Sequence, residues 1–263
     1  MKIRLTLFAS LFFLFSITSK AQKSIVNRWL VAGKLSQGEA FPIGNPQEYE
    51  FLKDKTYKIY DDGAVSVNGN YEMGVDGNSF FLKNGDISLK VKIVKLNMLE
   101  MNIVYDMGKT VSDTMVYYVS GTPNAKIATK KFKFADEYFK NLTSLEKLYM
   151  TRGEIVTTIS SAVKLKTKGN DSLINSIRQH LVKADKIVFN GAYVPKINVI
   201  QYNYIQENLD SKITQLLLLA EASNSVKSSK DYLDAKKKLS DNQKEIDKAK
   251  IKFNASFKSY YSA

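Results

Sequence analysis

The C-terminal stretch from Tyr232 to Tyr261 repeats a large side chain at every seventh residue, and this repeat constrains the fold more than any other feature of the chain. The large residues are Tyr232, Leu239, Ile246, Phe253 and Tyr260, and the seam positions between them are Ala235, Asn242, Ala249 and Ser256. Two seam positions in every seven residues are typical of a long helix that packs along one side. We expect the large side chains to fill a helical core, the small ones to let a neighbouring helix approach closely, and Asn242 to set the register.

Three further segments of the C-terminal half carry apolar residues at helical spacing. The first runs from Phe134 to Val163, the second covers residues 173–188, and the third covers about residues 199–222. Together with the heptad stretch they make four helices, which predicts an antiparallel helical bundle over residues 132–263.

The N-terminal half follows a different pattern, in which short runs of β-branched and aromatic residues alternate with polar ones between Trp29 and Val119. Turn sequences such as DDG at 61–63 and NGD at 84–86 separate these runs. We expect strands near residues 30–36, 48–53, 56–60, 64–73, 78–83, 86–95, 98–106 and 114–119. Strands joined in this order by short turns predict an eight-stranded antiparallel barrel over residues 22–120, with room for side chains or one small ligand.

A stretch of turn residues separates the two patterns. The segment SGTPNAKIATKK contains Gly, Pro and Asn and precedes the change from strand to helix spacing. The sequence therefore predicts a linker at residues 121–131 and a two-domain α+β chain.

The first residues have the form of a secretory signal peptide. Lys2 and Arg4 precede an apolar run from Leu5 to Ile17, and Ser19-Lys20-Ala21 follows as an S-x-A cleavage site. This run is shorter than the roughly 20 residues that a membrane-spanning helix needs. We expect cleavage after Ala21 and export to the periplasm or cell envelope, with an uncleaved membrane anchor as the alternative.

The sequence offers little for catalysis. It has no Cys and only one His, and His180 flanks the apolar stripe of a predicted helix, as a surface residue would. No phosphate-binding Gly-rich loop, HExxH or G-x-S-x-G motif occurs. Glu221 follows four leucines, where a hydrogen-bonding role at the helix end is favoured over catalysis. We predict a non-enzymatic protein with no catalytic residues, no cofactor and no metal site.

Charge is divided unevenly between the halves. Residues 125–263 hold 25 Lys and Arg against 14 Asp and Glu, whereas residues 22–124 hold 11 against 12. A basic helical surface outside the cytoplasm could meet anionic lipid or an envelope protein, and a solvated lysine-rich face is an equal alternative. Nucleic acid is not favoured, because Arg152 and Arg178 are the only arginines of the basic half.

Two resemblances to known families support this division. Trp29, the hairpin from Phe51 to Tyr57 and the G-x-Y strand at Gly69 to Tyr71 resemble the small lipocalin-like domains of exported Bacteroidota proteins. In the C-terminal half, four leucines followed by Ala220 and Glu221 are continued by Tyr232, Leu239, Ile246, Ala249, Phe253-Asn254, Phe257 and Tyr260. This pattern resembles the C-terminal region of the LemA family of bacterial envelope proteins, and the likeness extends more loosely back to about Tyr138, with Arg152 in the place of a basic pair. It implies an exported helical module whose biochemical role is poorly defined.

These observations lead to one functional expectation with an alternative. We expect a cell-envelope protein in which the barrel binds a ligand or partner and the basic bundle serves as a scaffold or contacts a membrane surface or partner. The alternative is a periplasmic carrier that holds a small apolar ligand in the barrel. The sequence does not identify the ligand, the partner or the oligomeric state.

Overall fold

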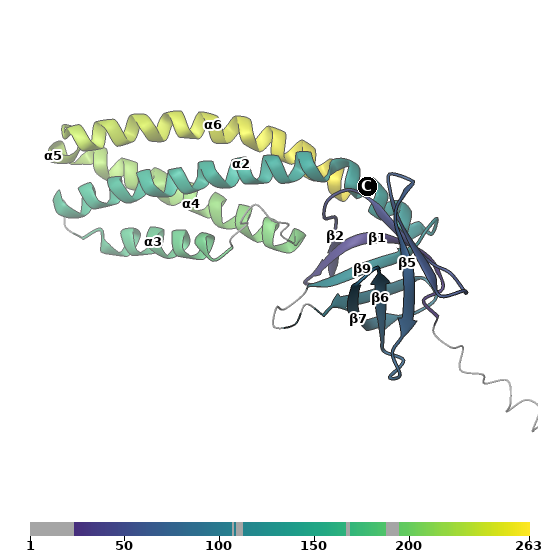
Figure 1. Ribbon diagram of the computed structural model, residues 1–263. Helices are drawn as coiled ribbons and strands as arrows, with labels where there is room; N and C mark the ends of the chain where they lie inside the picture. The colour runs from purple at the N-terminus through teal and green to yellow at the C-terminus, as the bar shows by residue number, and fades with distance from the viewer. Residues whose placement is uncertain (1–23, 107, 109–112, 167–168, 188–194) are drawn as a thin grey trace, which may run out of the picture. The chain divides into compact units, whose positions relative to one another are not determined.

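The computed structural model describes residues 24–106, 108, 113–166, 169–187 and 195–263 (Figure 1). The described residues form two compact units: a barrel unit of residues 24–35 and 42–126, and a helical unit of residues 36–41 and 127–263. The predicted signal peptide lies outside the described residues.

The barrel unit is an antiparallel sheet that closes on itself, as predicted. Its strands are β1 (Asn27–Ser36), β3 (Gln47–Phe51), β4 (Thr56–Asp61), β5 (Ala64–Met73), β6 (Ser79–Asn84), β7 (Ile87–Leu96), β8 (Glu100–Tyr105) and β9 (Thr114–Val119). Each pairs with the next, and β1 also pairs with β9, so the eight strands form a closed barrel (Figure 1). One short strand was not expected: β2 (Glu39–Phe41) stands next to β1 in the sheet order.

The turn residues act as the sequence indicated. Asp62 and Gly63 between β4 and β5 both have positive φ, at 49° and 82°, which suits a two-residue hairpin turn. Between β7 and β8, the Asn97 side-chain oxygen accepts hydrogen bonds from the backbone N–H groups of Leu99 and Glu100, at 2.9 and 2.8 Å.

Two details of the expected strands need correction. The strand expected near residues 98–106 begins at Glu100, so Leu99 belongs to the turn before β8 and is 55% exposed. Trp29 was expected to precede the first strand and instead lies within β1, fully buried, where its indole N–H donates to the Ile25 carbonyl at 2.7 Å. A register shift between Ile93 and Lys95 also changes the alternation, so that Leu96 joins the barrel core.

The helical unit contains four long helices and a short one. They are α2 (Pro123–Lys166), α3 (Asp171–Asp185), α4 (Lys196–Ala222), α5 (Asn224–Lys227) and α6 (Lys230–Tyr261). The short α5, between α4 and α6, was not predicted. Side-chain contacts fix the directions of three helices. The helices α2 and α4 run in the same direction, because Tyr149 meets Tyr202 and Arg152 meets Gln206. The helix α6 runs opposite to α2, because Leu148 meets Asn242 and the earlier Asn141 meets the later Lys252. None of the helices in the described part of the chain has the length and hydrophobicity of a membrane span.

The segment expected to be a linker is mostly helical. The backbone carbonyl of Thr122 accepts the first hydrogen bond of α2 from Lys126 at 3.0 Å, and the Thr122 hydroxyl lies 3.4 Å from the Ala125 N–H. Thr122 is therefore the N-cap and Pro123 the first helical residue, a position that proline favours because it needs no N–H donor there. The Gly-Thr-Pro sequence begins this helix, and the division between the two compact units falls within it, after Lys126.

Candidate functional site

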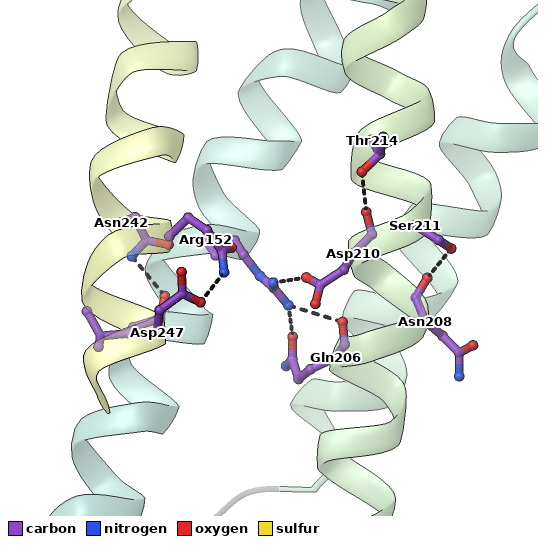
Figure 2. A network of polar contacts seen from close by, with 10 residues as sticks. Arg152, Gln206, Asn208, Asp210, Ser211, Thr214, Asn242 and Asp247 are labelled. Carbon is purple, nitrogen blue, oxygen red and sulfur yellow. Dashed lines mark hydrogen bonds and ion pairs between the residues drawn. The ribbon is translucent and has the colours of Figure 1, made fainter. Parts of the chain in front are cut away.

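A polar layer crosses the middle of the helical unit and divides its apolar core in two (Figure 2). One cluster contains Tyr149 of α2 and Ile205 of α4, and the other begins at Val156 and Leu209 of the same helices. The layer between them consists of Arg152 from α2, Gln206 from α4 and Asn242 from α6, all of which are buried.

Arg152 is the centre of this layer. Its side chain is fully buried, and its Nη1 forms an ion pair with Asp210, whose own side chain is 40% exposed. Its Nη2 donates to the Gln206 side-chain oxygen at 2.6 Å and to the Gln206 carbonyl at 3.3 Å. The guanidinium also lies 4.8 Å from the centre of the Tyr149 ring. The charge is thus compensated by one carboxylate, two neutral acceptors and an aromatic face.

Two polar atoms of the layer are left without a hydrogen bond. The Asn242 amide nitrogen donates to the Leu148 carbonyl at 3.1 Å, but within the described residues neither its Oδ1 nor the Arg152 Nε has a partner. An unpaired buried polar group costs about 1–3 kcal/mol. The burial of Asn242 and its bond to α2 fit the register-setting role predicted for it, which stays a prediction.

A second candidate site is the interior of the barrel, where three tyrosines meet. The hydroxyls of Tyr105 on β8 and Tyr117 on β9 share a hydrogen bond of 2.7 Å, and the Tyr49 ring of β3 meets the Tyr117 ring edge-on at 5.5 Å. Burial raises the pKa of Tyr117 well above its ordinary value, and it also raises the pKa of Tyr49 and Tyr105. The three phenols therefore stay neutral and can donate or accept hydrogen bonds.

The barrel interior is closely packed in one part and partly accessible in another. Phe51 has the rings of Tyr49, Tyr57, Tyr71 and Phe80 around it, at centroid distances of 5.3 to 6.4 Å. By contrast, several residues that pack against the barrel core are only partly buried, and five of them lie toward one end, which we call the Tyr105 end of the barrel. They are Ile59, Val67, Leu89, Tyr105 and Met115. The β4–β5, β6–β7 and β8–β9 connections all leave the sheet at this end, because the strands alternate in direction.

The seam residues predicted from the heptad repeat face the interior of the helical unit, the apolar ones within its two apolar clusters and Asn242 in the polar layer between them. Buried residues of the seam are Tyr232, Ala235, Leu239, Asn242, Ile246, Phe253, Ser256 and Tyr260. Ala249 is partly buried and packs against the same cluster as Phe253. On α2, Val156 is fully buried and its neighbour Ile155 is only partly buried.

The two titratable residues singled out in the sequence have local partners. The His180 Nδ1 lies 2.8 Å from the Ser176 carbonyl one turn earlier in α3, and the ring is half-buried. Glu221, the last acidic residue of α4, accepts hydrogen bonds from Lys236 at 2.5 Å and from the Tyr232 hydroxyl at 2.6 Å. These bonds, that of Lys236 first, lower the pKa of Glu221. Glu221 therefore links the end of α4 to the start of α6.

Sequence reasoning did not identify Gln206 or the Tyr105–Tyr117 pair. Gln206 could have been found, because it lies four residues after Tyr202 and three before Leu209, on the buried stripe of α4. The tyrosine pair joins two strands through a side-chain bond that no local pattern indicates.

Among the described residues, no group of three or more His, Cys, Asp and Glu side chains could hold a metal ion. No model of a known protein family matches the sequence, and no curated protein matches it either.

Proposed function

We propose that this chain is an exported, non-enzymatic protein of the cell envelope, in which the barrel binds a small ligand and the helical unit is a scaffold. The observation that carries the proposal is the Tyr105 end of the barrel, where partly exposed apolar side chains lie on β4, β5, β7 and β9 and the neutral hydroxyls of Tyr105 and Tyr117 share a hydrogen bond. A site of this composition suits a ligand with an apolar body and one polar group that can hydrogen-bond to a phenol. The resemblance of the C-terminal half to the LemA family supports the scaffold role and the envelope location.

The barrel contains its own reporter of binding. Trp29 is the only Trp of the chain and belongs to the barrel core. We expect N-phenylnaphthylamine, an uncharged apolar fluorophore, to bind with saturation and to quench Trp29 by energy transfer. An uncharged probe is preferable because an anionic dye would also bind the lysines of the helical unit.

Variants test whether the probe occupies the proposed site. Met115→Trp should fill the Tyr105 end and weaken binding at least tenfold, as followed by the fluorescence of the probe itself because this variant adds a second Trp. Tyr105→Phe/Tyr117→Phe should alter the affinity for probes that carry a hydroxyl group. Tyr118→Phe, on the opposite face of β9, is the matched control. Equal binding by wild type and Met115→Trp, with both folded by circular dichroism, would reject the barrel as the site.

The location has its own test. We expect the protein recovered from the exporting cell to begin at Gln22 and to appear in the periplasmic or envelope fraction. A mass that retains residues 1–21 would support an uncleaved anchor instead. Release of the protein from membranes by high salt would indicate electrostatic attachment.

A further inference from the structure

The helical unit carries charges of opposite sign at the two ends of one face. On α2, the residues at every seventh position from Lys133 are all exposed, and they read Lys133, Lys140, Lys147, Glu154 and Ser161. Seven residues are close to two helical turns, so these side chains form one row along the helix. The row is basic toward the start of α2 and acidic or neutral toward its end.

A second row of exposed charged residues lies beside it on α6, and its charge also changes from one end to the other. It reads Asp234, Asp241 and Lys248, again exposed and seven residues apart. The bond from Asn242 to Leu148 and the 3.5 Å contact between the Asn141 amide and the Lys252 carbonyl fix the antiparallel alignment of the two helices. Lys147 and Lys248 therefore lie on one side of the Asn242 level, and Glu154 and Asp234 lie on the other.

A groove between α2 and α6 occupies the acidic end. It has a volume of about 970 Å³ and is lined by the carboxylates of Glu154, Asp231, Asp234 and Asp241, with Lys238 as its single lysine. Exposed Leu165 and partly buried Ile155 give the groove an apolar component.

The basic end has the opposite composition. Lys133, Lys140, Lys147, Lys248 and Lys252 are exposed there, with the carboxylates Glu137 and Glu245 between them. Two ion pairs lie near the boundary between the ends, Asp241–Lys244 at 3.3 Å and Lys248–Glu245 at 3.0 Å. Both are exposed, so solvent screens them and they do not cancel the difference in charge between the acidic end and the basic end.

We propose that this α2/α6 face binds a second copy of the chain in an antiparallel, two-fold arrangement. A two-fold axis through the Asn242 level places the basic end of each copy over the acidic end of the other, so the face is complementary to itself. From Lys133 to Ser161 the face is about 42 Å long, and two adjacent helices are roughly 20 Å wide. The projected area of about 800 Å² per partner matches a standard specific interface.

A second copy fits this face better than an anionic lipid surface. A bilayer would attract the basic end but repel the four carboxylates of the groove. The two-fold arrangement uses both ends. It rests on the helical unit alone and is independent of any ligand in the barrel.

Reversing the charge at one end at a time tests the pairing. Sedimentation of the purified wild-type protein at low salt should show a dimer that dissociates as salt is raised, because exposed charge pairs are screened. Lys140→Glu/Lys147→Glu makes both ends acidic, and Asp234→Lys/Asp241→Lys makes both ends basic. Each variant alone should dimerise at least tenfold more weakly than wild type. An equimolar mixture of the two should form a heterodimer, because the acidic face of one then matches the basic face of the other.

The control is Lys183→Glu/Lys186→Glu, which makes the same change of net charge at the end of α3 and should leave the dimer intact. A wild type that is monomeric at low salt, or single-end variants that do not associate when mixed, would overturn the proposal. Vesicles of anionic phospholipid test the competing explanation. The proposal is also overturned if they bind the wild-type monomer and Asp234→Lys/Asp241→Lys but do not bind Lys140→Glu/Lys147→Glu.

Discussion

The ring of Tyr138 on α2 stacks on the ring of Tyr260 on α6, with 4.7 Å between the centroids and 7° between the planes. Both side chains are fully buried, and Phe253 and Phe257 flank the Tyr138 ring. This aromatic cluster aligns the start of α2 with the end of α6, and the Arg152 layer aligns the middles of the two helices with α4.

The aromatic cluster should dominate the stability of the bundle. Phe253→Ala removes a buried ring and should lower the free energy of unfolding by about 3–5 kcal/mol. Ala249→Leu should overpack the same seam and cost about 1–3 kcal/mol. Urea unfolding followed by circular dichroism measures both changes. The control Lys237→Ala, at an exposed position of α6 outside the seam, should change stability by less than about 0.5 kcal/mol, and a cost equal to that of Phe253→Ala would place the seam on the wrong face.

The seam was predictable from sequence because a seven-residue period reports which side of a helix is buried. The barrel was predictable for a similar reason: alternating residues and turn signals define each strand, and short turns leave few ways to order them. Phe41 shows what local patterns omit. It is the last residue of β2, yet its side chain belongs to the core cluster of the helical unit with Tyr138 and Tyr260. Contacts between residues about a hundred positions apart leave no periodic trace in the chain.

We expect the hydrogen-bond partners of Arg152, rather than its charge alone, to determine how much the Arg152 layer lowers the free energy of unfolding. Gln206→Leu removes the side-chain oxygen that accepts a hydrogen bond from the buried Arg152 and should lower stability by about 1–3 kcal/mol. Arg152→Leu/Gln206→Leu joins the two apolar clusters and should be neutral or stabilising relative to wild type. Gln201→Leu, the same change at an exposed position on α4, is the control for helix propensity. A double variant less stable than Gln206→Leu would contradict this account.

The Glu221 bonds predict a dependence on acid pH. Because Lys236 and Tyr232 lower the pKa of Glu221 in the folded protein, its contribution is present above the unfolded pKa and is lost as pH falls through the lower folded value. The urea midpoint of wild type should exceed that of Glu221→Gln at neutral pH, and the two should converge below about pH 4. A difference that stays constant down to that pH would show that the carboxylate charge is not involved.

Buried tyrosines predict the opposite behaviour at alkaline pH. Burial raises the pKa of Tyr117, Tyr138 and Tyr202, so the neutral forms are favoured in the folded state. Their contribution is present below the unfolded pKa of about 10 and is lost as pH rises above it. Tyrosinate absorbance should therefore appear in two phases, exposed residues first and buried ones together with loss of the circular-dichroism signal. A single phase near the ordinary value, without unfolding, would show that these rings are accessible.

The discontinuous helical unit leads to the last prediction. Residues 36–41 belong to this unit, and Phe41 is buried in the cluster that contains Tyr138, Phe253 and Tyr260. A fragment of residues 127–263 keeps the four long helical segments but loses the Phe41 side chain, so it should fold as a helical protein with a lower melting temperature than the helical unit in the full chain. Phe41→Ala in the full chain should reproduce most of that loss, about 3–5 kcal/mol, because it empties the same place in the cluster. Phe41→Leu, which refills much of that space, should recover part of it. If the fragment melts at the same temperature as the helical unit of the full chain, or if Phe41→Ala leaves stability unchanged, then Phe41 is not part of the core that holds the helices together.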